Sequence, residues 1–371
     1  MESQAWTGVR MLGLGCLTVD GFQPRQLKNA PSASFARHEA VLCDGDLLVS
    51  RANTRDLVGL AGIFRDVGVP CIYPDLMMRL RTSDLYLPEF LELVLRSPET
   101  RRRIVALAQG TSESMVKISG SVIRRLRVPA VPISEQRRIV EVIDAVSVQE
   151  SSIQAAVDKM RQLRSGLLDQ AFCETMDRWS LVAIGDLCHV GSGATPSRAA
   201  GSRYFADAGT PWVKSLDLNE GSLSVTDEAL TDVAMSELRM RLFPARSVLV
   251  AMYGGWEQIG RTAILEVPAA VNQAISVLEM HADMDPYYLL LALQHGRYRW
   301  RQFAASTRKD PNITKSDVLA FGIPFPPREE QERIVDLATA SLREIAADEE
   351  ELTKMRNLKR GLLSGLLADA I

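Results

Sequence analysis

The chain has 371 residues, of which 46% are hydrophobic and 24% are charged, and its net charge at pH 7 is −3. These values are typical of a globular protein with two or three domains. No apolar run reaches the roughly 18 residues of a membrane span, and the first ten residues resemble no signal peptide, so we expect a cytoplasmic protein without membrane contact. The charge balance excludes a strongly basic nucleic-acid binder, so any nucleic-acid surface must come from local clustering.

The cysteines are odd in number and widely scattered, at Cys16, Cys43, Cys71, Cys173 and Cys188. None of them forms a C-x-x-C pair. We therefore expect neither a disulfide framework nor a zinc site, and we expect a reduced protein.

Residues 1–132 predict a first globular module with mixed α and β structure. Short apolar runs such as GVRMLGL (8–14) and LLVS (47–50) alternate with Gly, Pro, Asp and Asn, which is typical of strands joined by turns. The segment 88–107, PEFLELVLRSPETRRRIVAL, then predicts a helical region.

A long helix is predicted over residues 133–174, after the proline-rich stretch RVPAVP, which ends the preceding element. Apolar residues recur every seven positions, with others three positions further on: Ile139, Val146, Ile153, Met160 and Leu167, then Val142, Ala156 and Leu163. Because no proline interrupts this stripe, it favours pairing with another helix. At 1.5 Å per residue, about 37 residues would extend roughly 55 Å.

Residues 175–326 predict a second module with the same order of elements. Its strand WVKSLDL (212–218) parallels GVRMLGL, and LVAMYGGWEQIGRTAIL (249–265) parallels LVSRANTRDLVGLAGIF (48–64). Residues 179–204 precede the WVKSLDL strand, and the first module has no matching stretch. We therefore expect the first module to be N-terminally short.

A second long helix is predicted over residues 327–371, again after a proline-rich stretch, GIPFPP. Its apolar stripe comprises Ile334, Ala338, Ile345, Leu352, Met355, Leu358 and Leu362.

The strongest signal is an internal repeat, because residues 118–168 align without gaps to residues 313–363. Identical pairs include Ile118/Ile313, Pro129/Pro324, Glu135/Glu330, Gln136/Gln331, Arg138/Arg333, Ile139/Ile334, Arg161/Arg356 and Leu163/Leu358. The chain is therefore a tandem duplication of a module and a long helix. We predict an α+β fold in which the two helices pack as a coiled-coil-like spacer.

These residues carry a resemblance to a known family. A proline-rich start, then EQRRIV or EQERIV, then KMRQLRSGLL or KMRNLKRGLL, resembles the conserved helix of specificity subunits of type I restriction-modification systems. In the second module, Trp179, IGDL (184–187), SGATPSR (192–198) and TPWVKSLDL (210–218) resemble the opening of that family's target recognition domain. The resemblance covers nearly the whole chain.

The resemblance implies two target recognition domains, each reading one half of a split, asymmetric sequence of double-stranded DNA. It also implies that the paired helices set the gap between the half-sites and dock two methyltransferase subunits, and that restriction subunits can join. No cofactor is then expected in this chain, because S-adenosylmethionine and ATP belong to the partners. Helix residues suggested for docking are Gln136, Arg138, Ile139, Arg161, Gln331, Arg333, Ile334 and Arg356.

Candidate DNA-binding residues lie in polar loops of both modules. Arginine and asparagine can bind base edges, Tyr and Trp can contact or wedge bases, and Lys, Ser and Thr suit phosphate. In the first module the candidates are Arg51, Asn53, Thr54, Arg55, Thr111, Ser112 and Lys117. In the second they are Lys214, Ser215, Tyr253, Gly254, Trp256, Thr307, Arg308 and Lys309. A solvated polar turn, or core packing for Trp256, is the alternative.

Catalytic motifs are weak or incomplete. Residues 285–288, DPYY, lack the second proline of an adenine methyltransferase motif, and the four histidines have no acid or cysteine partners at metal-ligand spacing. We predict a non-catalytic chain without a metal site. A coiled-coil scaffold that reads no DNA, and a methyltransferase fused to its own recognition domain, are the alternatives. Sequence preference in DNA binding and methyl transfer by the isolated chain would distinguish them.

Overall fold

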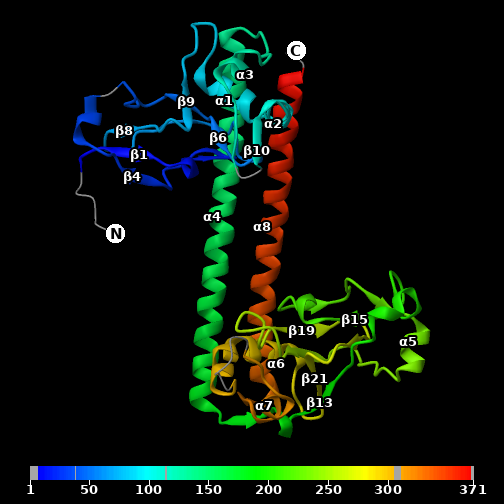
Figure 1. The fold of residues 1–371 in the computed structure, drawn as a ribbon. Helices are drawn as coiled ribbons and strands as arrows, with labels where there is room; N and C mark the ends of the chain where they lie inside the picture. Colours follow the sequence, from blue (N-terminus) through cyan, green and yellow to red (C-terminus); the bar gives the residue numbers. More distant parts are fainter. Residues whose placement is uncertain (1–6, 38, 113–114, 305–310, 369–371) are drawn as a thin grey trace. The chain divides into compact units, whose positions relative to one another are not determined.

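The computed structural model describes residues 7–37, 39–112, 115–304 and 311–368. It divides into two compact units, the first comprising Met1–Ala156 with Asp348–Ile371 and the second comprising Val157–Ala347. Each unit combines one globular module with one section of each long helix (Figure 1). The predicted α+β class is confirmed by this mixture of sheets and helices. Over the described stretches, every helix is too short or too polar to traverse a bilayer.

The first unit contains small sheets followed by short helices. Its elements are β1 (Arg10–Leu12), η1 (Leu14–Cys16), β2 (Leu17–Thr18), β3 (Gly21–Phe22), β4 (Leu27–Asn29), η2 (Ala33–Arg37), β5 (Leu47–Ser50), β6 (Ala52–Asn53), β7 (Ala61–Ile63), β8 (Cys71–Ile72), β9 (Met77–Leu80), α1 (Pro88–Arg96), α2 (Pro98–Leu107), β10 (Gln109–Ser112), β11 (Met115–Lys117) and α3 (Gly120–Arg124). Strand orders are β4-β1-β8, β7-β5-β9, β10-β11-β6 and β2-β3. The central strand β5 is buried throughout, as its continuous apolar run predicts.

The second unit contains a larger sheet. Its elements are β12 (Leu181–Ala183), η3 (Ile184–Asp186), β13 (Cys188–Ser192), η4 (Arg198–Arg203), β14 (Phe205–Ala206), β15 (Thr210–Val213), η5 (Ser215–Asp217), β16 (Ser222–Leu223), β17 (Ala229–Leu230), α5 (Asp232–Glu237), β18 (Val248–Ala251), β19 (Thr262–Leu265), β20 (Ala270–Val271), β21 (Ile275–Met280), α6 (Pro286–His295), η6 (Gly296–Gln302), α7 (Lys315–Ala320) and β22 (Gly322–Pro324). Strand orders are β13-β21-β18-β19-β16, β14-β17-β15-β20 and β12-β22.

The two units share a three-stranded core. The antiparallel order β7-β5-β9 in the first unit corresponds to β19-β18-β21 in the second. In the second unit, β13 pairs with the outer edge of β21, and β12 pairs with β22. Among the described residues of the first unit, no strand pairs with the outer edge of β9 and none precedes the long helix at the position of β22. The two strands formed by residues 181–192 are therefore a feature of the second unit.

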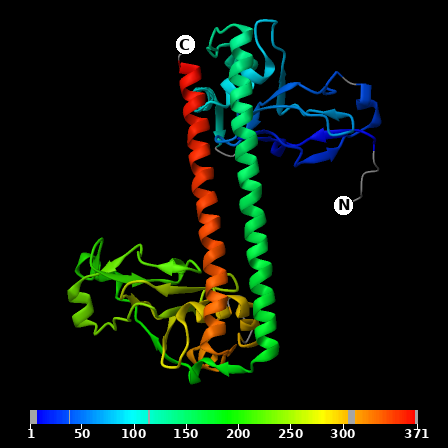
Figure 2. The ribbon, with the colours of Figure 1, turned by 180° about the vertical axis from the view of Figure 1, so that it is seen from behind.

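Two long helices follow the modules, α4 (Ile133–Arg178) and α8 (Arg328–Ala368). α4 begins where the sequence predicts but continues four residues beyond the predicted end at residue 174, because no glycine or proline interrupts residues 175–178. Each unit holds an antiparallel contact between the helices, which run side by side in both views (Figures 1 and 2). The predicted helix pairing is confirmed.

In the first unit, Ile139 and Ile143 of α4 pack with Leu362 of α8 and Phe90 of α1. Glu150 accepts hydrogen bonds from Arg356 Nε (3.1 Å) and Lys359 Nζ (3.0 Å). Burial raises the pKa of the Glu150 carboxyl, but the hydrogen bonds and charges of Lys359 and Arg356 together outweigh it, so the pKa lies below its usual value.

In the second unit, the helix contact is apolar. Ala171 and Phe172 of α4 share one core with Ile334 and Ala338 of α8. The Phe172 ring also stacks on His295 at 4.9 Å between centroids. The helices are therefore an integral part of each module's core.

The predicted apolar stripe of the first helix is partly wrong. Val142 and Leu163, three positions beyond the seven-residue series, are 39% and 51% exposed. The buried positions lie four residues beyond it, at Ile143 and Val157, which are 1% exposed. Three- and four-residue spacings both suit a helix of 3.6 residues per turn, and at Ile143 packing with Phe90 and Leu93 of the first module selects the second.

Candidate nucleic-acid interface

The same hairpin loop occurs once in each unit, between β5 and β7 in the first and between β18 and β19 in the second. Backbone hydrogen bonds close the two loops at equivalent positions. In the first loop the Gly59 N–H donates to the Ser50 carbonyl (2.7 Å) and the Val58 N–H to that of Thr54 (2.9 Å). In the second loop the Gly260 N–H donates to the Ala251 carbonyl (2.9 Å) and the Ile259 N–H to that of Gly255 (2.9 Å). Each residue of the second loop follows its counterpart by 201 positions. The two loops, residues 51–59 and 252–260, are therefore closed by the same backbone hydrogen bonds and are called the recognition loops below.

A glycine ends each recognition loop in a left-handed conformation. The φ angles of Gly59 and Gly260 are +73° and +71°. A Cβ atom on Gly59 would lie 2.4 Å from Ile104 Cγ2, and one on Gly260 would lie 2.3 Å from Trp300 Cδ1. Only glycine meets both demands, so these two residues fix how each loop returns to the sheet.

The first recognition loop gathers most of the predicted residues of its module. Arg51, Thr54 and Arg55 are exposed, while Asn53 is half-buried and accepts a hydrogen bond at Oδ1 from the Thr54 N–H (2.9 Å). Strand β11 pairs with β6 and so brings the exposed Lys117 opposite Ala52. The strand pairing thus places Lys117 beside the residues that open the loop, between Arg51 and Asn53.

Thr111 and Ser112 lie in β10, which pairs with β11. The structure therefore joins their backbone to the sheet of the first recognition loop, but their side chains are outside the described set. Thr307, Arg308 and Lys309 lie outside the described residues altogether. The segment after residue 310 is described. In the second unit the Ile313 N–H donates to the Met252 carbonyl (3.0 Å), and in the first unit the Ile118 N–H donates in the same way to the Arg51 carbonyl (2.9 Å).

The second recognition loop presents aromatic side chains. Tyr253 is 42% exposed and Trp256 41% exposed, so Trp256 is not a core residue. Gly254 lies between them with a φ of +107°, where a Cβ would come within 2.8 Å of Gln258. Both aromatic side chains are thus accessible, and the predicted contact of these residues with DNA stays a prediction.

Sequence reasoning missed two residues beside this loop. Tyr298 and Arg301 are both exposed and lie in η6. The guanidinium carbon of Arg301 lies 5.7 Å from the Trp256 ring centroid. Together with Trp256 they line a pocket of about 320 Å³. The alternation of basic and aromatic residues in GRYRWR (296–301) was the available signal.

Lys214 forms ion pairs within its own unit, and its predicted contact with DNA stays a prediction. Its Nζ lies 3.2 Å from Glu228 Oε1 and 3.7 Å from Asp227 Oδ2, and only 22% of its side chain is exposed. Two carboxylates compensate the ammonium charge, which opposes a phosphate contact. The neighbouring Ser215 begins the short helix η5, and its proposed contact with DNA stays a prediction.

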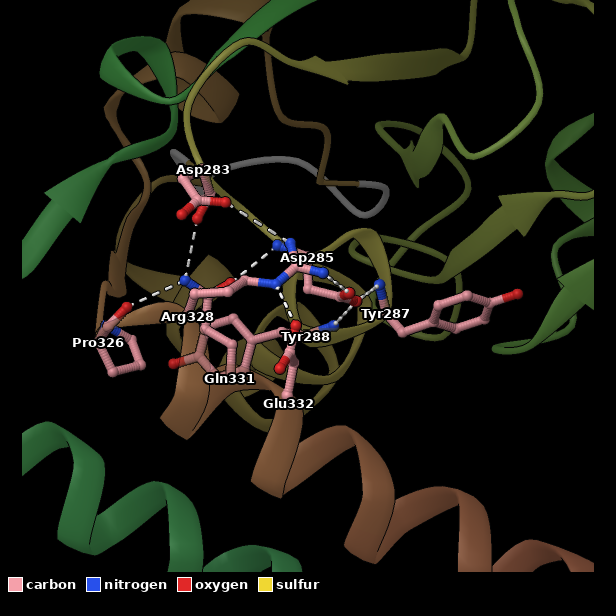
Figure 3. Close-up of polar contacts among 8 residues, drawn as sticks. All are labelled: Asp283, Asp285, Tyr287, Tyr288, Pro326, Arg328, Gln331 and Glu332. Atoms are coloured by element: carbon pink, nitrogen blue, oxygen red, sulfur yellow. Dashed lines mark hydrogen bonds and ion pairs between the residues drawn. The ribbon is translucent and has the colours of Figure 1, made fainter.

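Gln136 and Gln331 do not face a partner, because both are fully buried. The Gln331 side chain accepts from the Asp285 N–H (2.8 Å) and donates to the carbonyls of Asp283 (3.2 Å) and Pro326 (2.9 Å) (Figure 3). Gln136 makes the same three bonds in the first unit, to Leu87, Leu85 and Val131. Each glutamine therefore fastens the start of a long helix to its own module.

Ile139 and Ile334 are also buried, at 3% and 0% exposure, and belong to the core of their units. The prediction that they and the two glutamines bind a partner is wrong, because repeated identity here maintains internal packing. The helix arginines are exposed: Arg138 and Arg333 lie near Glu135 (3.9 Å) and Glu330 (2.7 Å). Arg161 and Arg356 are likewise exposed, and for all four the docking role stays a prediction.

The DPYY segment has a structural role. Asp285 caps α6 by accepting hydrogen bonds from the N–H groups of Tyr287 (2.8 Å) and Tyr288 (3.2 Å), and Arg328 Nη2 lies 2.8 Å from its other oxygen (Figure 3). The buried Tyr288 hydroxyl donates to the Pro324 carbonyl (3.0 Å). Within the described ranges, no three His, Cys, Asp or Glu side chains gather as metal ligands would.

Comparison with known proteins identifies a family. Residues 176–354 match the model of the type I restriction modification DNA specificity domain. The specificity subunit of the Escherichia coli type I restriction enzyme EcoR124I/EcoR124II is 21% identical over 213 residues, which cover 56% of this chain and 52% of that one. The specificity subunit of EcoKI, from Escherichia coli strain K12, is 30% identical over 142 residues, 37% of this chain and 30% of that one.

The matched parts thus span about half or less of the length of these curated relatives. A chain from a solved structure on complex assembly and conformational transition of the type I restriction-modification system extends the likeness in fold. It covers 96% of this chain and 90% of its own length, with a TM-score of 0.64 and 19% identity. Residues 176–354 therefore match the type I restriction modification DNA specificity domain, and the likeness in fold to the solved chain extends over both units.

Proposed function

We propose that this chain is the DNA sequence-recognition subunit of a type I restriction-modification complex and is itself non-catalytic. Each unit reads one half of a bipartite, asymmetric site on double-stranded DNA, and the paired helices set the gap between the halves. The observation that carries this proposal is the repeated recognition loop. The hydrogen bonds and the left-handed glycine that close the loop recur in both units, yet its exposed side chains differ. A duplicated frame with divergent side chains is what reading two unlike half-sites requires.

The first recognition loop suits base edges in the major groove. Arg51 and Arg55 can each donate two hydrogen bonds to the O6 and N7 atoms of guanine, and Asn53 can pair with adenine. Lys117 on the neighbouring strand suits a phosphate, which would hold the loop in register without reading sequence. This unit therefore recognises its half-site chiefly through hydrogen bonds.

The second recognition loop suits stacking. Tyr253, Trp256 and Tyr298 expose aromatic faces, and Arg301 supplies a cation beside Trp256. Aromatic side chains contact or wedge bases, and a neighbouring arginine supports both phosphate contact and stacking. This unit therefore recognises its half-site with a larger apolar contribution than the first.

Two methyltransferase subunits dock on the helices, and restriction subunits can join this core. S-adenosylmethionine and ATP are bound by those partners, in the cytoplasm where the DNA is methylated. Equivalent leucines of the repeat mark the docking surface, because Leu163 in the second unit and Leu358 in the first are both 51% exposed. A leucine exposed at the same position of both copies provides two like contacts for two like partners.

The test is selection of bound sequences from random duplex DNA by the complex assembled with its methyltransferase subunits. We expect a split motif, and we expect Trp256→Ala to weaken binding roughly tenfold or more, in line with the loss of one aromatic stack. The motif of the variant should lose definition on one side only. Leu216→Ala, which removes another exposed apolar side chain of the second unit (75% exposed), is the matched control. Unchanged affinity and motif in the Trp256 variant would exclude this loop from recognition, and a wild-type complex without sequence preference would indicate a scaffold.

A further inference from the structure

An arginine holds the second recognition loop from outside. Arg297 lies in η6, just after α6, and its guanidinium donates from Nε to the Ile259 carbonyl (3.1 Å) and from Nη2 to the Glu257 carbonyl (2.6 Å). The remaining Nη1 forms an ion pair with Glu220 (2.6 Å). All three nitrogens of this side chain are thus engaged, and two of them hold the loop backbone.

The first recognition loop is held in the same way. Arg101 lies in α2 and donates from Nη1 to the Val58 carbonyl (2.5 Å) and from Nη2 to the Asp56 carbonyl (2.8 Å). These two carbonyls follow the offset of 201 positions that relates the recognition loops, so both arginines bind the same two points. Burial lowers the pKa of Arg101, and the nearby Asp56 partly opposes this shift.

The repeated contact does not follow from the aligned repeat of the long helices. Arg101 lies in an α-helix, whereas Arg297 lies in a 3-10 helix, and neither lies in the segment that aligns without gaps. Each arginine precedes by three positions the side chain that packs on the loop glycine, Ile104 or Trp300. The two halves of the chain thus retain the arginine and the packed neighbour although the surrounding helices differ.

We propose that Arg101 and Arg297 are positioning residues for DNA recognition, each setting the base preference of its own half-site by fixing the recognition loop. This inference rests on the proposed function. Neither guanidinium needs to touch DNA, because its donors are directed at the loop carbonyls. A loop held at two carbonyls presents its side chains in one geometry, and fixed geometry is what discriminates between bases. The planar fork of arginine can span two carbonyls, which a lysine ammonium cannot match.

The experiment compares Arg101→Lys and Arg297→Lys in the full complex, because lysine keeps the charge and removes the fork. We expect Arg101→Lys to reduce discrimination between bases roughly tenfold in one half of the selected motif, near the lower limit for one good base contact. Arg297→Lys should do the same in the other half only. The salt dependence of binding should stay unchanged, because the number of positive charges is unchanged. Arg102→Lys, at an exposed position of the same helix, is the matched control and should change neither half.

Hydrogen exchange supplies a second readout that does not depend on DNA. Amides of residues 54–59 should exchange faster in Arg101→Lys, while those of residues 255–260 keep wild-type rates, and Arg297→Lys should show the converse. Glu220→Gln, which leaves both carbonyl contacts of Arg297 in place, should affect the same half-site as Arg297→Lys but less strongly. A wild-type complex that selects no sequence would refute the proposed function itself. With a normal wild-type motif, unchanged discrimination in both lysine variants, or equal loss in both halves, would overturn the positioning role.

Discussion

Replacing Gln331 by leucine should destabilise the second unit by about 3 kcal/mol or more, because each buried polar group left without a partner costs about 1–3 kcal/mol. The side chain is fully buried and satisfies three backbone groups, the Asp285 N–H and the carbonyls of Asp283 and Pro326. Leucine has a similar volume, so the loss reports the hydrogen bonds and not a cavity. Urea unfolding of the full chain, combined with exchange of the Asp285 amide, measures both the size and the place of the effect.

Gln136→Leu makes the equivalent change in the first unit and should produce a similar loss there. Asn357→Leu is the matched control, since it replaces an exposed amide on α8 and should shift the free energy of unfolding by no more than about 0.5 kcal/mol. If Gln331→Leu were as stable as the control, the glutamine would not fasten the helix to the module, and a direct role in partner binding would regain support.

Introducing aspartate at Leu163 and Leu358, the exposed leucines at equivalent positions of the repeat, should prevent assembly with the methyltransferase subunits. Leu163→Asp with Leu358→Asp buries two uncompensated carboxylates in the proposed docking surfaces, and about 3 kcal/mol at each would weaken docking roughly a hundredfold. Each single variant should lose one of the two partners. Native mass spectrometry of the co-expressed complex distinguishes two, one and no bound subunits.

Both leucines are half exposed in their own units, so neither substitution should lower the unfolding midpoint of the isolated chain. Val225→Asp, an exposed apolar position of the second module (78% exposed), is the control and should leave the complex intact. A double variant that still binds two methyltransferase subunits would place the docking surface elsewhere.

The sequence predicts the long helices well, because an ungapped repeat with proline-rich boundaries leaves little freedom in where they begin. It misled us about what the repeated residues do. Gln136 and Gln331 look like surface amides in EQRRIV and EQERIV, and only the folded chain shows that each binds one N–H and one carbonyl 46 to 51 positions earlier. Residues identical in both copies can therefore attach each long helix to its own module.

The recognition loops were found because polar or aromatic residues follow a buried strand, a local pattern. The residues that hold them were missed, since Arg101 sits in a run of three arginines that resembles a solvated helix surface. Its contacts with the carbonyls of residues 56 and 58 join segments more than 40 positions apart. No local periodicity encodes such a contact, whereas comparison of the two structural copies reveals it at once.

The most direct test of the central claim is the methylome of a host that expresses this chain with its methyltransferase subunits. The account predicts a single new bipartite motif, asymmetric, with defined bases on both sides of a fixed gap. Substituting the first recognition loop should change one side of that motif, and substituting the second should change the other. A stable complex that adds no new methylated motif, or a motif that neither loop alters, would contradict recognition by the two loops.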